Sequence, residues 1–281
     1  MAKASNYTSK QPDENGVIHW SEEENKIWSE LVARQLACIE GKACDEYLAG
    51  LKKINLPTDR IPQLSELNEV LLETTGWQVA PVPALIDFDE FFRLLANKQF
   101  PVATFIRTRE EFDYLQEPDI FHEIFGHCAM LTNPDFAEFT HKYGQLGYAA
   151  EKKDRVYLAR MYWFTVEFGL MKTDDGMRIY GAGIVSSRTE SVFAVEDPSP
   201  NRLHFDLERV MHTDYRIDDY QQVYFAINSF EELLEATYQD FGPLYEKMSR
   251  DKHVHPITDI LESDVVYTEG TQAYAMARAA E

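Results

Sequence analysis

The sequence is poor in cysteine, in basic residues and in long apolar runs, and each shortage excludes a class of protein. Its 281 residues include three cysteines, Cys38, Cys44 and Cys128, which form no CxxC pair and no even framework. A disulfide scaffold is therefore excluded, and we expect buried, reduced thiols and a cytoplasmic protein. No apolar run approaches the roughly 18 residues of a membrane span, and the polar opening has no signal-peptide pattern.

The shortage of basic residues excludes a second class. Lys and Arg number 27 against 48 Asp and Glu, which gives a formal net charge of −21. A surface this negative repels nucleic acid and anionic membranes, so we expect neither as a partner. The hydrophobic share of 44% is ample for a core in a chain of this length.

Helical patterns fill most of the chain. Ser21 and Glu24 form a capping box, and apolar residues follow at helical spacing until Gly41. A shorter helix is expected around Cys44–Leu48, and the histidine-bearing stretch before Pro134 reads as another. Further helices are predicted over residues 65–75, 87–97, 135–150, 154–170 and 230–250.

Extended segments are fewer. Pro81 and Pro83 exclude a helix over 77–86, and residues 100–108 are a second extended stretch. Strand character follows only later, at 177–180, 191–194 and 223–227. We expect a mostly α (α+β) fold, one helical domain over 16–250 with a small β-sheet. Residues 1–15 are expected to form a flexible N-terminus, and 251–281 a tail of unknown role.

Two stretches place ionisable side chains inside apolar sequence. His122 and His127 stand in PDIFHEIFGHCAML, and Glu167 is alone in YWFTVEFGL. Imidazoles and carboxylates that lose their water need a compensating partner. Two histidines and one carboxylate on a metal meet that need, and this set is typical of a non-haem Fe(II) site with open positions. The alternative is that backbone carbonyls satisfy each histidine.

The spacing of the histidines excludes one familiar metal motif. They are five residues apart, roughly 140° around an ideal α-helix, against roughly 40° for the HExxH spacing of zinc peptidases. We expect Gly126 to let the turn distort. Cys128 adjoins His127, but a packed thiol is favoured over a ligand.

Other polar residues have two interpretations each. Glu123 is a functional carboxylate or a solvated helix residue, and its spacing favours the second. Arg107 ends the apolar run FPVATFI and is a surface cap or a fixed fork for a carboxylate. Ser186 and Ser187 are turn residues, or donors that orient a ligating imidazole. Core packing is the default for the neighbouring aromatics Phe91, Tyr162, Trp163 and Phe164.

Together these stretches resemble the aromatic amino acid hydroxylases, and most of all their short bacterial members. The resemblance runs from about residue 20 to 246. It rests on the motifs IPQL, PVPALI, FPVATFIR, EPDIFHEIFGH, YWFTVEFGL and YGAGIVSS, in that order. It implies a helical catalytic domain with a small sheet. It also implies a monooxygenase that uses Fe(II), a tetrahydropterin and O2 to convert L-phenylalanine to L-tyrosine.

The resemblance assigns roles to residues. It makes the iron ligands His122, His127 and Glu167. It places the tetrahydropterin on Leu85, Phe91, Glu123 and Tyr162, with Phe91 stacked on its ring. It gives the substrate to Arg107, Trp163, Gly183 and Ser186. Ser186 is also expected to reach His122 as a hydrogen-bond partner.

The chain departs from the larger animal members in several places. It lacks their regulatory domain and tetramerising helix, so we expect a monomer. The pterin segment has Ala84 where they have glycine, and Asp87 and Phe88 where they have serines. Ile217 stands where tyrosine hydroxylases carry an acid, which favours phenylalanine because an apolar side chain offers a substrate hydroxyl no partner.

Two rival functions remain open to test. One is a zinc hydrolase with Glu123 as the base, which the HEIFGH spacing disfavours. The other is a helical binding protein whose histidines and Glu167 are structural. Metal analysis separates all three, because the favoured function requires iron, the hydrolase zinc and the binding protein no metal.

Overall fold

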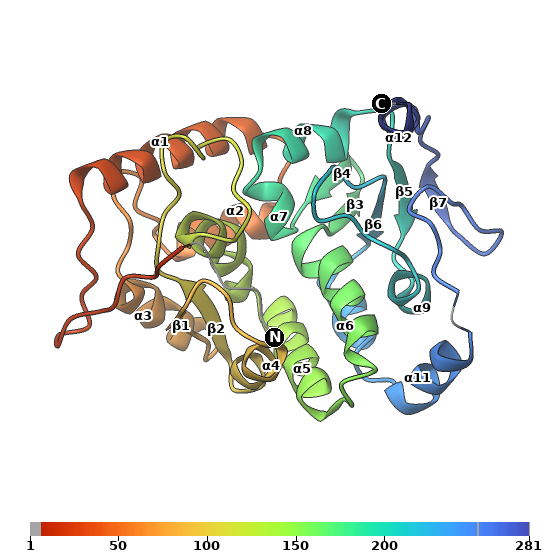
Figure 1. Ribbon diagram of the computed structural model, residues 1–281, viewed down its shortest axis with the longest axis horizontal. Coiled ribbons are helices and arrows are strands. Elements are labelled where there is room, and N and C mark those ends of the chain that lie inside the picture. The colour runs from red at the N-terminus through yellow and green to blue at the C-terminus, as the bar shows by residue number, and fades with distance from the viewer. Residues whose placement is uncertain (1–6, 252, 281) are drawn as a thin grey trace. The chain divides into compact units, whose positions relative to one another are not determined.

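Helices dominate the chain, as the sequence predicts (Figure 1). The structure is a computed structural model that describes residues 7–251 and 253–280. The chain divides into two units, Met1–Ala149 and Ala150–Glu281. The mostly helical fold with a small sheet is thereby confirmed, whereas the domain bounds 16–250 stay a prediction.

The first unit is built from helices around one short parallel strand pair. Its elements are α1 (Glu22–Ile39), α2 (Asp45–Lys53), α3 (Leu64–Thr74), β1 (Gln78–Val82), α4 (Phe88–Ala96), β2 (Gln99–Ala103), η1 (His122–Cys128), η2 (Met130–Thr132) and α5 (Pro134–Ala149). The predicted capping box of α1 is present, with Ser21 Oγ accepting from the backbone N–H of Glu24.

The strands β1 and β2 occupy the two stretches expected to be extended. They pair in parallel, with Gln78 opposite Gln99, and α4 makes the crossover between them. Each has a neighbour on one side only, so Pro81 and Pro101 cost few ladder hydrogen bonds.

Aromatic side chains fill the core of the first unit. Trp28 of α1 meets Phe121 edge-to-face at 5.8 Å, and Phe121 stacks on Phe125 at 4.9 Å. Each is at most 1% exposed, and burying one such ring contributes about 1.5–3 kcal/mol. The candidate metal-binding segment η1 is therefore anchored in the buried aromatic core of the unit.

The segment predicted to be flexible, 1–15, is only partly within the described residues. From residue 7 onward it runs along the end of β2. Tyr7 stacks on Phe105 at 4.7 Å, and the N–H of Lys10 donates to the carbonyl of Thr104 at 2.8 Å.

The second unit carries a mixed five-stranded sheet in the order β4-β3-β6-β5-β7. Its strands are β3 (Leu170–Thr173), β4 (Gly176–Ile179), β5 (Asn201–His204), β6 (Val223–Ile227) and β7 (Val266–Thr268). Its helical elements are α6 (Arg155–Tyr162), η3 (Trp163–Glu167), α7 (Ala182–Val185), α8 (Arg188–Glu196), α9 (Leu207–Met211), α10 (Phe230–Glu235), α11 (Phe241–Arg250) and α12 (Ala273–Ala279).

Three sequence predictions fail in this unit. The strand expected at 191–194 is part of the helix α8, whose N-cap Ser187 accepts from the N–H of Glu190. The helix expected over 230–250 is two helices, and Asp240 caps the second. The helix expected over 154–170 becomes η3 at Trp163 and then the strand β3 at Leu170.

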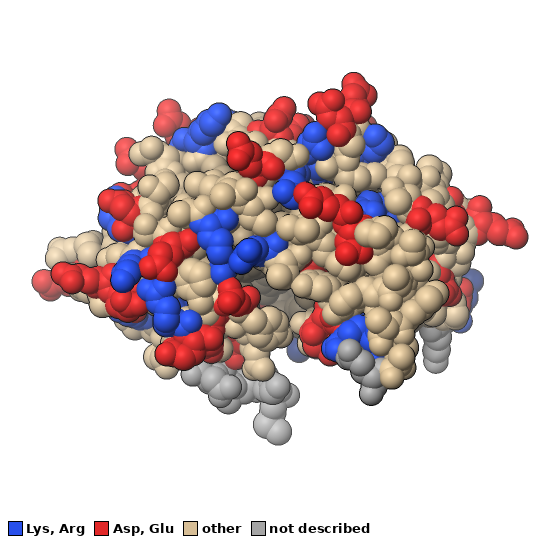
Figure 2. Space-filling view, turned by 90° about the horizontal axis from the view of Figure 1, so that it is seen from above, with Lys and Arg blue, Asp and Glu red and all other residues tan. Residues whose placement is uncertain are grey.

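The tail after residue 250 has structure of its own. Strand β7 pairs antiparallel with β5, and α12 follows it (Figure 1). No helix within the described ranges combines the length and the apolar character needed to cross a membrane. On the face drawn in Figure 2, acidic and basic side chains are interspersed despite the net charge of −21.

Candidate metal centre

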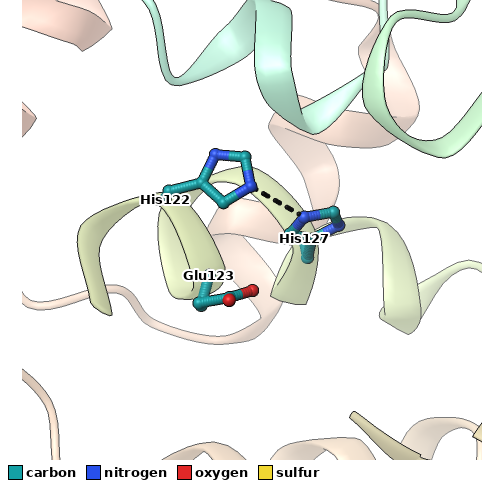
Figure 3. A group of neighbouring side chains, drawn as sticks. All are labelled: His122, Glu123 and His127. Carbon is teal, nitrogen blue, oxygen red and sulfur yellow. Dashed lines mark hydrogen bonds between the residues drawn. The ribbon is translucent and has the colours of Figure 1, made fainter. Parts of the chain in front are cut away.

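The two histidines lie on a π-helix, η1, which resolves their unusual spacing. In a π-helix the hydrogen bonds join residues i and i+5, so residues five apart lie about one turn apart on the same side. The Nε2 atoms of His122 and His127 face each other at 3.1 Å, and the ring planes are 81° apart (Figure 3). The predicted distortion near Gly126 is therefore a full π-helical segment.

Neighbouring residues hold this segment in its less common form. The Tyr47 hydroxyl donates to the carbonyl of Phe125 at 2.6 Å, which satisfies a backbone acceptor inside the π-helix. Gly50 of α2 lies so close that a Cβ there would be 2.1 Å from the carbonyl oxygen of Ala129. Phe100 of β2 packs on the ring of His127, with centroids 4.7 Å apart.

Glu123 completes a group of three ligand-type side chains. One carboxylate oxygen and the imidazole nitrogens of His122 and His127 all lie within 4.8 Å of one another (Figure 3). Glu123 is only 9% exposed, so the solvated helix carboxylate favoured by spacing is wrong.

The donor set fits a metal ion. Two imidazole nitrogens bound at right angles to one ion, each at about 2.1 Å, lie about 3 Å apart, which agrees with the 3.1 Å between the Nε2 atoms. Imidazole and carboxylate ligands suit iron, zinc and related ions. Cys128 is fully buried, burial raises the pKa of its thiol, and its Sγ donates to the carbonyl of Glu123. It packs as a neutral thiol, as favoured.

Arg107 is neither exposed nor a surface cap. Its guanidinium donates hydrogen bonds to the Asp119 carboxylate from Nε at 2.8 Å and from Nη2 at 2.9 Å. The backbone N–H of Arg107 donates to the same carboxylate. Burial alone would raise the pKa of Asp119, but the charge and hydrogen bonds of Arg107 hold it below its usual range. The guanidinium of Arg107 therefore binds a carboxylate through two nitrogens, as one of the two interpretations predicts. Within the described residues that carboxylate is Asp119.

Asp119 is a buried residue of the candidate site that no sequence pattern had singled out. Its Oδ1 accepts from the backbone N–H of His122 at 3.1 Å, so it caps the start of η1. It thus joins the candidate substrate residue Arg107 to the candidate ligand His122. The signal was present in EPDIFHEIFGH, as an acid three residues before the first histidine.

Of the predicted pterin residues of the first unit, Glu123 lies on η1, whereas Leu85 and Phe91 lie around β1 and α4. Leu85 follows β1 and is 40% exposed, and Phe91 lies on α4 with its ring 5.6 Å from that of Phe92. Asp87, one of the departures from the animal members, is the N-cap of α4 and accepts from the N–H of Glu90. Ala84, another departure, is buried against Ala103 and Phe105.

The remaining predicted residues lie on α6, η3 and α7 or at their ends, in the second unit. Tyr162 precedes η3, a second π-helix, and Glu167 is its last residue. Gly183 of α7 packs on that end, since a Cβ there would lie 3.2 Å from the carbonyl oxygen of Glu167. Ser186 is the C-cap of α7 and donates to the carbonyl of Ala182 at 2.7 Å.

Trp163, at the start of η3, lies in a stack of three rings. Phe168 covers one side at 4.7 Å and Tyr215 stacks at 4.6 Å, both nearly parallel to the indole. The indole Nε1 donates to the side-chain oxygen of Gln221 at 3.0 Å. Neither Tyr215 nor Gln221 was singled out in the sequence.

Two imidazoles and a carboxylate within 4.8 Å of one another on a π-helix form a group that could hold a metal ion. A family model described as biopterin-dependent aromatic amino acid hydroxylase matches residues 1–263. The chain belongs to that family.

Relatives match along nearly the whole chain. A phenylalanine-4-hydroxylase of Pseudomonas aeruginosa is 56% identical over 248 residues, which are 88% of this chain and 94% of the relative. A Chromobacterium violaceum phenylalanine hydroxylase structure with iron and phenylalanine bound has a TM-score of 0.85 and 44% identity, covering 94% of this chain and 95% of that one. A second, with iron(III) and 7,8-dihydrobiopterin, has a TM-score of 0.86 and 45% identity, covering 95% and 94%.

Proposed function

We propose that this chain is a phenylalanine 4-monooxygenase, an iron- and tetrahydropterin-dependent enzyme that hydroxylates L-phenylalanine to L-tyrosine with O2. The observation that carries the proposal is the pair of imidazoles facing each other on η1, in a chain whose family match spans residues 1–263. The Chromobacterium structures support it, since they hold iron, phenylalanine and dihydrobiopterin.

The metal ligands in this proposal are His122, His127 and Glu167, as the resemblance assigns them. Iron(II) and the reduced pterin together supply the electrons that O2 needs before it reacts with an aromatic ring. Asp119 and Tyr47 fix the backbone of the π-helix, and Phe100 packs on the ring of His127, so these residues would orient the imidazoles towards the metal.

Substrate binding in this proposal centres on Arg107. Two hydrogen bonds from the guanidinium to Asp119, with a third from the backbone N–H of Arg107, hold the side chain in place, and among the described residues Nη1 is left for the carboxylate of an amino acid. Trp163 would wall the aromatic ring, with Gly183 and Ser186 beside the amino acid end. Ser186 would also reach His122.

The pterin would lie against the segment after β1. Phe91 would stack on its ring, and the backbone near Leu85, with Glu123 and Tyr162, would bind its polar edge. The half-exposed Leu85 fits that role, because a residue on the surface of the unit is accessible to a ligand. We also propose that the enzyme works as a monomer in the cytoplasm.

Phenylalanine is favoured over tyrosine as the substrate. Ile217 is 75% exposed and offers no hydrogen-bond partner to a phenolic hydroxyl. Replacing it with aspartate would supply that partner, so Ile217→Asp is expected to raise activity on tyrosine relative to phenylalanine.

Anaerobic reconstitution with Fe(II) tests the proposal. After addition of phenylalanine, a tetrahydropterin and air, chromatography should show tyrosine, and Glu167→Gln should lose both iron and product. Glu123→Gln should keep its iron and show a raised KM for the pterin. Loss of metal in Glu123→Gln but not in Glu167→Gln would place Glu123 in the coordination sphere, as the three-residue group around η1 also allows. Retained zinc without any hydroxylated product would favour the hydrolase.

A further inference from the structure

The C-terminal helix α12 lies beyond residue 263, where the family match ends. It has seven residues, none of them buried, and helices this short are not stable alone in water. It therefore stays where it is because of specific contacts. Some of those contacts are made to the loop Asp214–Gln222, in the same unit, and the N–H of Tyr274 also donates to Ser199 Oγ at 2.9 Å.

One carboxylate of this loop receives both polar side chains of the helix. The Tyr274 hydroxyl donates to Asp219 Oδ1 at 2.6 Å, and Arg278 Nε donates to Asp219 Oδ2 at 3.0 Å. The Asp219 side chain is only 9% exposed. Burial would raise the pKa of Asp219, but these bonds, with the N–H of Tyr220, hold it below its usual range. The carboxylate is thus charged, and each of its two oxygens accepts a hydrogen bond from the tail.

Ring contacts and a hydrogen bond to a backbone carbonyl also attach the tail. Tyr274 lies 5.1 Å from the ring of Tyr220 and 5.4 Å from that of Phe193. The side-chain amide of Gln272 donates to the carbonyl of Gln222 at 3.2 Å. The tail therefore contacts the loop at three positions, Asp219, Tyr220 and Gln222.

The same loop holds Trp163 through Gln221. Gln221 is 1% exposed, and its side-chain oxygen accepts from the Trp163 indole at 3.0 Å. Its amide nitrogen donates to the carbonyls of Arg216 at 2.7 Å and Asp219 at 3.3 Å, which closes the loop on itself. Because Tyr215 stacks on Trp163 as well, the indole is fixed by both ends of the loop.

We propose that Tyr274 and Arg278 are positioning residues for the aromatic substrate, acting through Asp219 on the loop and through Gln221 on the indole of Trp163. The inference rests on the proposed function, in which Trp163 walls the substrate ring and Ile217 lies in this loop.

Besides the tail, Tyr220 stacks on Phe193 at 4.6 Å and the N–H of Gln221 donates to Glu190, but neither contact binds the Asp219 carboxylate. Ile217 and Asp218 are exposed, and Asp218 and Asp219 are adjacent like charges. Arg216 pairs with Asp218 at 3.1 Å and lies 3.8 Å from Asp219, so it offsets only part of this repulsion. Without Tyr274 and Arg278, Asp219 would turn to water, and the Gln221 side chain would lose the geometry that meets the indole.

The double variant Tyr274→Phe/Arg278→Gln of the full, iron-loaded chain tests this. We expect KM for phenylalanine to rise roughly three- to tenfold, while kcat, the KM for pterin and the iron content change less than about twofold. Amide hydrogen exchange over residues 214–222 should become faster. The single variant Arg278→Lys should recover part of the effect, because it keeps the charge.

Tyr267→Phe is the matched control. It removes another hydroxyl of the tail, which donates to Asn228 rather than to the loop, and it should leave KM and loop exchange unchanged. Unchanged exchange in the double variant would overturn the inference, and so would faster exchange with an unchanged KM. A wild type that makes no tyrosine would overturn the proposed function itself, which is a distinguishable result.

Discussion

Two buried carboxylates, one in each unit, have opposite acid–base behaviour. Asp119 is fully buried and bound by the guanidinium of Arg107, which holds its pKa below the usual range. Glu190 is 6% exposed and accepts from the Tyr224 hydroxyl and the Gln221 N–H. Burial raises its pKa to about 7. No cation lies within ion-pair distance of it among the described residues.

The difference shows that the partner, not the depth of burial, sets the charge of a buried acid. A cation with a two-pronged fork keeps Asp119 ionised, whereas neutral donors leave Glu190 close to the pH at which it gains a proton. Asp119 lies one hydrogen bond from a residue of the proposed site, and Glu190 lies two. Asp119 caps His122, and Glu190 binds the backbone of Gln221, which holds Trp163.

The largest expected effect comes from removing the cation that binds Asp119, the guanidinium of Arg107. Arg107→Ala leaves the Asp119 charge buried without its partner, so the free energy of unfolding should fall by about 3–5 kcal/mol. Urea denaturation at pH 7 measures this loss. Arg109→Ala is the control, because Arg109 binds Glu23 and Glu30 at the exposed surface, where a pair contributes about 0–1 kcal/mol. Similar losses in both variants would mean that the Asp119 pair is not special.

Removing the charge of Glu190 should have a smaller effect that depends on pH. The folded pKa is about 7 against 4.5 for an ordinary glutamate, so between these values the folded protein holds a proton that the unfolded chain has released. Stability from this group is full below about pH 4.5 and is lost as pH rises towards 7, by roughly 3 kcal/mol in all.

Glu190→Gln should remove this dependence. Relative to wild type, its free energy of unfolding should increase between pH 4.5 and 8, as urea denaturation at several pH values would measure. The exposed Glu231→Gln controls for the loss of one negative charge. A stability difference that stays constant with pH would show that Glu190 is ionised throughout.

The smallest expected effect comes from the hydroxyl beside Glu190. The Tyr224 hydroxyl donates to the carboxylate and so favours its charged form. Tyr224→Phe should shift the pH midpoint of the stability loss upward and cost about 1 kcal/mol above pH 7. The same urea series reads out both quantities, and a midpoint shifted downward would contradict the assigned direction of the hydrogen bond.

Much of the fold could be predicted from local patterns. The capping box at Ser21 and the prolines at 81 and 83 affect the backbone of residues next to them in the chain. Their effects can therefore be predicted from the sequence alone. The same kind of signal, Ser187 followed by Glu190, marked the start of α8 but was overlooked in favour of a strand. Gly242 and Pro243, at the start of α11, likewise marked the break after α10.

The candidate site was harder to predict because its geometry depends on tertiary contacts. His122 and His127 could be paired from their apolar surroundings, but an ideal α-helix would have kept them apart, and the π-helix depends on Tyr47 and Gly50 from elsewhere in the chain. Asp119 and Gln221 have ordinary sequence surroundings, and only their hydrogen-bond partners show what they do.

The π-helix also determines how small a mutation separates this histidine pair from the HExxH motif. Deleting Gly126 alone would leave the residues His-Glu-Ile-Phe-His, and ordinary α-helical hydrogen bonding would then bring the same two imidazoles to one side. Three nucleotides therefore separate this segment from the spacing used by zinc peptidases. Insertion or deletion of one codon can thus convert a π-helical histidine pair into an α-helical one, or the reverse. Neither histidine needs to be replaced.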